Sequence, residues 1–90
     1  MSVLVRIPTP LRRFVDGNSV LEAQGQTVSQ VLGYLSQRYP GVVQRLYDGG
    51  SLRPFINIYL NNEDIRFLQG EGTAVKDGDV ISIVPAIAGG

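Results

Sequence analysis

Residues 27–41 read TVSQVLGYLSQRYPG, and this stretch predicts one amphipathic helix. Thr27 is a residue type that caps helix N-termini, and Gln30 follows it at the spacing of a capping box. Pro40 and Gly41 are typical of a helix end. Because such a helix must bury its apolar side against another element, the flanking segments are expected to form a sheet. The apolar stripe consists of Val28, Val31, Leu32, Leu35 and Tyr39.

Two strands are predicted before this helix. Residues 3–7 read VLVRI, with apolar side chains at alternate positions, as a half-buried strand requires. Pro8 and Pro10 end that strand. A second strand over residues 19–23 follows the turn sequence at residues 16–18, DGN. The two strands are expected to form a hairpin with a long loop.

The strongest strand signal follows the helix, at residues 55–60, which read FINIYL and are rich in β-branched and aromatic side chains. A further helical turn at residues 42–47 and a short edge strand at residues 65–68 are expected around it. The last strand, residues 80–84, follows the tight-turn sequence KDGD at residues 76–79.

This order of elements predicts an α+β fold of the β-grasp type, with a mixed sheet of four to five strands packed on one main helix. Ile81 and Ile83 are expected to face the helix, and Ser82 is expected to face away from it. We expect residues 1–85 to form the single domain and residues 86–90 to form a flexible tail.

Composition excludes several kinds of chemistry. The chain of 90 residues has eight basic and eight acidic residues, so its formal net charge is zero. A neutral chain lacks the basic face of a general nucleic-acid or anionic-membrane binder. It contains no cysteine and no histidine, so thiolate nucleophiles, iron–sulfur clusters and the commonest metal ligand are missing. We therefore expect no metal, no bound cofactor and no catalysis by the chain alone. Without a signal-peptide pattern or a membrane span, a cytoplasmic protein is expected.

The C-terminal sequence AIAGG, residues 86–90, is the feature that can carry chemistry. Glycine has no Cβ, so an enzyme can close around Gly89 and Gly90 and reach the terminal carboxylate. That carboxylate is ionised at neutral pH and unreactive as an acyl donor until it is activated, for example as an acyl-adenylate. The alternative is an incidental frayed end.

Three segments resemble the MoaD/ThiS family of ubiquitin-like sulfur carriers. They are residues 55–67, FINIYLNNEDIRF; residues 83–90, IVPAIAGG; and the opening residues 5–14, VRIPTPLRRF. The opening and residues 58–67, IYLNNEDIRF, are most similar to the CysO type. The resemblance covers almost the whole chain. It implies that an E1-like activating enzyme of the MoeB/ThiF type uses ATP to adenylate Gly90, and that a terminal thiocarboxylate follows. Gly89 matches the penultimate glycine of the family. We expect Ala88 and Gly89 to provide the extended, unbranched approach through which the enzyme recognises the tail.

The resemblance leaves the destination of the sulfur open. The acceptor would be an enzyme such as cysteine synthase or the molybdopterin synthase large subunit, and the thiazole of thiamine is a third destination. The CysO-type segments favour cysteine. Two further readings remain: a ubiquitin-like modifier joined to lysine side chains through Gly90, and a β-grasp interaction module with an incidental tail.

A partner-docking patch is also predicted on the face of the sheet opposite the helix, because an exposed apolar patch on a small protein usually marks a contact site. The alternative is an ordinary mixed outer face, and a one-residue slip in strand register would invert the assignment. The predicted patch, around Arg6 and Ser82, consists of Phe55, Tyr59, Leu4, Val80 and Val84.

Overall fold

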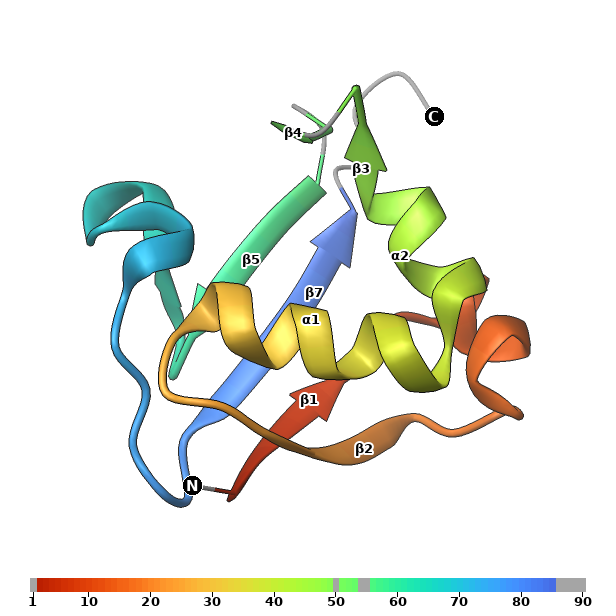
Figure 1. Ribbon diagram of the computed structural model, residues 1–90, viewed down its shortest axis with the longest axis horizontal. Coiled ribbons are helices and arrows are strands. Elements are labelled where there is room, and N and C mark those ends of the chain that lie inside the picture. The colour runs from red at the N-terminus through yellow and green to blue at the C-terminus, as the bar shows by residue number, and fades with distance from the viewer. Residues whose placement is uncertain (1, 50, 54–55, 86–90) are drawn as a thin grey trace.

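The computed structural model describes residues 2–49, 51–53 and 56–85, and in them one long helix crosses one face of a five-stranded sheet (Figure 1). The sheet order is β2-β1-β7-β5-β6. The helix is α1 (Val28–Arg38). This is the α+β architecture of a β-grasp, as the sequence predicted. The strands are β1 (Ser2–Arg6), β2 (Val20–Gln24), β5 (Ile56–Leu60), β6 (Glu63–Asp64) and β7 (Val80–Pro85).

The central pairing of the sheet joins the first strand to the last. β1 and β7 run parallel, with Val5 opposite Ile81, while the pairs β1–β2, β5–β7 and β5–β6 are antiparallel. Alternate residues of each strand point to opposite faces, so every second side chain is buried under α1. Ile81 and Ile83 lie in this core and Ser82 between them is partly exposed, which confirms the predicted orientation of the last strand.

Helix α1 begins where the sequence predicts. The backbone N–H of Gln30 donates to Thr27 Oγ1 at 3.1 Å, so Thr27 is the N-cap. The Gln30 side chain also accepts a hydrogen bond, 2.9 Å long, from the backbone N–H of Gln26. The predicted stripe of Val28, Val31, Leu32 and Leu35 is buried, and Tyr39 packs against the core as the C-cap.

The structure contains more helix than the sequence predicted, in two segments. The expected turn after Pro40 is a full helix, α2 (Pro40–Leu46), because proline at a first helical position is already set to helical φ. The loop between β1 and β2 contains a 3-10 helix, η1 (Thr9–Val15), which buries Leu11 and Val15. A two-stranded hairpin of β3 (Tyr47–Asp48) and β4 (Ser51–Leu52) follows α2.

The expected edge strand at residues 65–68 was wrong. The edge strand is β6, and residues Ile65–Phe67 form a 3-10 helix, η2. The Asp64 side chain accepts a 2.9 Å hydrogen bond from the backbone N–H of Arg66, and this local bond favours a helical turn over strand pairing. A third 3-10 helix, η3 (Gly70–Gly72), follows.

The alternation along β7 makes a direct stability prediction. We expect Ile81→Ala to lower the free energy of unfolding by about 2–5 kcal/mol, because Ile81 is fully buried and its removal leaves a cavity under α1. Ser82→Ala, one residue along, is the matched control, with an expected change within about 0.5 kcal/mol. Urea unfolding of the two variants measures the difference, and equal losses would contradict the observed strand faces.

Candidate functional site

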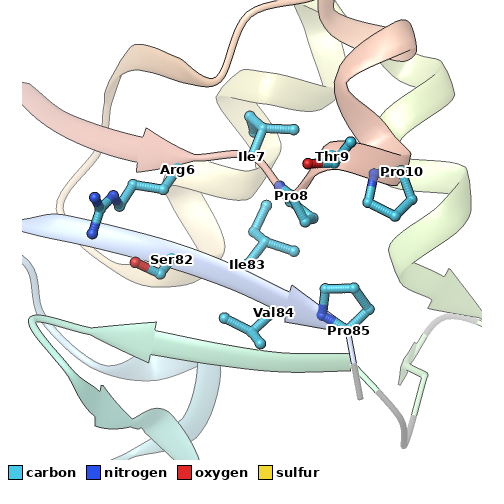
Figure 2. Close-up of a pocket in the computed structure, with 9 residues that line it drawn as sticks. All are labelled: Arg6, Ile7, Pro8, Thr9, Pro10, Ser82, Ile83, Val84 and Pro85. Atoms are coloured by element: carbon cyan, nitrogen blue, oxygen red, sulfur yellow. The ribbon is translucent and has the colours of Figure 1, made fainter. Parts of the chain in front are cut away.

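A groove of about 430 Å³ opens beside the last residues of β7 (Figure 2). The parallel ladder between β1 and β7 stops at the pair Arg6–Ser82. Beyond it, Pro8 has no N–H to continue the ladder, and the chain winds into η1. The end of β7 therefore loses its neighbour on that side, and an apolar groove remains. Its lining consists of Arg6, Ile7, Pro8, Thr9, Pro10, Ser82, Ile83, Val84 and Pro85.

The floor and the rim of the groove differ in character. Ile7 and Ile83 are each 2% exposed and belong to the core, so the floor is rigid and apolar. Arg6 and Thr9 are exposed at the rim, and three prolines limit the movement of the walls. Such a groove fits an apolar side chain or an extended segment of a protein partner.

A second hollow, of about 300 Å³, continues the groove across the outer face of the sheet. Its lining residues are Tyr59, Asn62, Ser82 and Val84, and the last two also line the groove. Tyr59 lies directly opposite Ser82 in the ladder between β5 and β7. The groove and the hollow thus form one surface, which we call the exit surface because the chain continues from Pro85 into residues 86–90.

The structure places the described members of the predicted patch on this outer face. Leu4 lies beside Val80 and is 42% exposed, and Val84 is 41% exposed. Tyr59 lies between them and the edge strand, with Arg6 and Ser82 in the same row across the sheet. The docking role of these residues stays a prediction. Phe55, Ala88, Gly89 and Gly90 lie outside the described residues.

Sequence reasoning missed the groove itself. Pro8 and Pro10 were interpreted as strand terminators, which they are, but the space that they leave beside Pro85 depends on the parallel pairing of β1 with β7. A sequence signal for the groove does exist: Pro8 and Pro10 follow β1, Pro85 ends β7, and these two strands are neighbours in the sheet.

Among the described residues, two titratable groups have shifted pKa values, and neither lines the exit surface. Burial raises the pKa of the Tyr47 phenol, and its hydrogen bond to the Glu71 carboxylate raises it further. The hydrogen bond from the Asn61 side chain lowers the pKa of Asp79, and the backbone N–H of Lys76 lowers it as well. Asp79 holds the turn before β7, so we interpret both groups as structural.

Within the part of the chain that the structure describes, no group of three or more carboxylates could hold a metal ion. No helix in the same residues is long and apolar enough to cross a membrane. The exit surface offers a partner apolar contact in the groove and positive charge from the exposed Arg6.

Comparison with known proteins identifies the family. The model of the ThiS family matches residues 5–90. The chain belongs to the ThiS family. It is also 45% identical to the sulfur carrier protein CysO of Mycobacterium tuberculosis over 93 aligned positions that cover both chains completely.

Solved structures of similar proteins support the family assignment. A chain of the BexX/CysO complex from Amycolatopsis orientalis is 44% identical, with a TM-score of 0.91 over 98% of this chain and 99% of that one. The small archaeal modifier protein 1 of Methanosarcina acetivorans is 33% identical, with a TM-score of 0.88 over 99% and 96% of the two chains. Members similar to this chain thus include proteins named as sulfur carriers and proteins named as modifiers.

The half-buried Tyr59 on the outer face of the sheet yields a prediction about binding. We expect Tyr59→Asp to weaken binding of the activating enzyme that the family resemblance implies, while it lowers the free energy of unfolding by only about 1 kcal/mol. Ile58→Asp, at the neighbouring buried position, is the contrasting variant and should unfold the protein by burying a charge. Thermal melting and a pull-down with the enzyme separate the two effects. If Tyr59→Asp unfolds the protein or binds normally, the assignment of this face is wrong.

Proposed function

We propose that this protein is a sulfur carrier whose working group is the α-carboxylate of Gly90. The observation that carries the proposal is the full-length match to the sulfur carrier CysO, together with the terminal Gly-Gly sequence. The groove at the end of β7 supports it, since a protein that takes up residues 86–90 must lie against this end of the domain.

The proposed chemistry has two steps, and an E1-like activating enzyme performs the first. A carboxylate oxygen of Gly90 attacks the α-phosphorus of ATP, pyrophosphate leaves, and an acyl-adenylate forms. Hydrosulfide from a sulfide source then attacks the carbonyl carbon and expels AMP, and loss of the proton on sulfur leaves a thiocarboxylate. ATP is a substrate of the enzyme in this scheme, and the carrier holds no cofactor of its own.

The domain contributes a rigid body from which a short segment leaves. Five residues follow Pro85, and an extended chain spans at most about 3.6 Å per residue, so Gly90 reaches no more than roughly 18 Å from the end of β7. The active site that takes Gly90 must therefore lie close to the exit surface. We propose that the groove and the patch of Leu4, Tyr59, Val80 and Val84 contact the enzyme around that site.

The likeness to CysO favours an acceptor enzyme that makes cysteine over one that makes molybdopterin or the thiamine thiazole. The acceptor would bind the same thiocarboxylate at Gly90, with Gly89 and Ala88 inside its active site. A cysteine synthase that consumes the thiocarboxylate form of this chain in a purified system would support this destination.

Similarity to a small archaeal modifier protein supports a second function, protein modification. The activation step is the same, and the nucleophile becomes the side-chain amine of a lysine, which displaces AMP to form an isopeptide bond. Conjugates on a denaturing gel that depend on Gly90 and resist thiol reagents would favour this function over sulfur transfer.

The central prediction concerns Gly90. With its activating enzyme, ATP and a sulfide source, the protein should exchange one oxygen for one sulfur at the C-terminal residue, as intact-protein and fragment mass spectrometry can show. Deletion of Gly90 should abolish the exchange and leave the melting temperature unchanged, since residues 86–90 follow the last described strand. Gly89→Val should slow adenylation, because a branched side chain then stands where the enzyme closes on backbone.

Gly89→Ala is the matched control and should retain more activity than Gly89→Val. An unchanged mass with a cognate enzyme that forms the adenylate of another carrier would contradict the sulfur-carrier function, as would sulfur located at any other residue.

A further inference from the structure

The net charge of this chain is zero, but acidic and basic residues lie in different regions along the central strand. β7 begins at Val80, and the turn before it carries Asp77 and Asp79, next to Lys76. β5 ends opposite this region, since its Leu60 pairs with Ile81, and the edge strand that follows carries Glu63 and Asp64, with Arg66 beyond it. Carboxylates therefore outnumber cations where β7 begins.

Four arginines lie on η1, at the end of α1 and on α2, away from those turns. Helix α2 packs against both η1 and α1 (Figure 1). Asp16, at the end of η1, is the one acidic residue within these segments. We call this group the arginine face, and it consists of Arg12, Arg13, Arg38 and Arg45.

Three of these four arginines stack on aromatic rings. The guanidinium groups of Arg13 and Arg45 each lie 4.9 Å from the centroid of the Phe14 ring. The ring itself rests on α2, where a Cβ on Gly41 would come within 3.1 Å of Phe14 Cδ1. The guanidinium of Arg38 lies 4.8 Å from the Tyr34 ring. A guanidinium that stacks on a ring keeps its N–H edge available, so these groups are arranged in advance to bind carboxylates.

Among the described residues, no carboxylate forms an ion pair with the arginine face. The ion pair seen among the described residues links Arg66 to Asp64 at 4.0 Å, and it involves none of the four arginines. Arg12 donates through Nε to the backbone carbonyl of Ile7 at 3.0 Å, which ties it to the wall of the groove. The other three arginines are exposed.

The arginine face adjoins the exit surface. Thr9, the first residue of η1, lines the groove, and a seven-residue 3-10 helix is only about 14 Å long. Residues 86–90 reach at most roughly 18 Å from Pro85, so a protein that takes up Gly90 also covers the region around η1.

We propose that the arginine face docks an acidic surface of the activating enzyme, and that the separated charges orient the carrier with its exit surface toward that enzyme. This inference rests on the proposed function and names the partner chemistry at a surface outside the groove. The electrostatic field of the separated charges raises the rate at which the correctly oriented complex forms. The acidic turns before β7 disfavour an approach in which they face the acidic surface of the enzyme.

An acidic protein fits this surface better than a nucleic acid does. The Phe14 ring already carries two guanidinium groups, so it is not a free platform for a base. Two of the cations, Arg13 and Arg45, also stack on one ring, whereas a nucleic-acid strand needs cations spread along its phosphates.

The test compares two variants of equal net charge in the thiocarboxylate-forming reaction. Arg13→Gln combined with Arg45→Gln removes two positive charges from the arginine face. Lys76→Glu changes the net charge by the same amount in the turn before β7, and the Lys76 backbone bond to Asp79 does not need its side chain. Thermal melting checks that both variants fold.

We expect the double glutamine variant to raise the KM for the carrier roughly tenfold with kcat unchanged, and Lys76→Glu to leave the KM within about twofold of the wild-type value. The KM of the wild-type chain should rise with added salt more steeply than that of the double variant. Arg13→Lys with Arg45→Lys should recover part of the loss, because it restores charge without the planar fork.

An unchanged KM for a folded double glutamine variant overturns this inference and leaves the proposed function in place. An equal rise for Lys76→Glu also overturns it, since net charge alone would then account for the effect. Binding of a labelled single-stranded oligonucleotide that the double variant loses would assign the face to nucleic acid instead. If the wild-type chain gains no sulfur at all, the proposed function and this inference fail together.

Discussion

The parallel ladder between β1 and β7 joins the two ends of the domain, and the placement of every site residue depends on it. It sets Val5 beside Ile81, both fully buried beneath α1. Burial of each such side chain contributes roughly 1.5–3 kcal/mol. Two parallel strands cannot be joined by a tight turn, so the helix and the rest of the chain must lie between them. Loss of this pairing would leave α1 without the centre of the face that it covers.

The point at which this ladder ends determines what the surface can offer. Pairing stops at Arg6 and Ser82, Pro8 turns the chain away, and the groove opens beside the last residues of β7. Ile83 points inward and holds the fold, whereas Val84 points outward and lines the groove. Because successive residues of one strand have different tasks, substitutions at neighbouring positions can separate folding from binding.

Local signals explain which elements the sequence could predict. The apolar stripe of α1 and its Thr27 cap are encoded within a few residues, and both were predicted correctly. The 3-10 helix η1 has no comparable pattern, because its form depends on Leu11 and Val15 reaching a core that the rest of the chain builds. At residues 65–68 the apolar residues indicated a strand, but the Asp64 side chain accepts a hydrogen bond from the Arg66 backbone N–H, which favours a helical turn. The arginine face could not be predicted from the sequence either, because packing brings together segments whose residues are up to 33 positions apart, from Arg12 to Arg45.

The group proposed to react is a main-chain carboxylate, which every protein possesses, so selection must come from residues 86–90 and from the surface around their exit. The two parts of that surface act over different distances. The field of the arginine face extends over a Debye length of about 8 Å at physiological salt, so it affects approach and orientation. The apolar groove acts only on contact, so it affects how long a partner stays. A carrier must be released after each transfer, and this favours fast, oriented association over a long-lived complex. A modest apolar groove beside a stronger electrostatic face is the combination that meets both requirements.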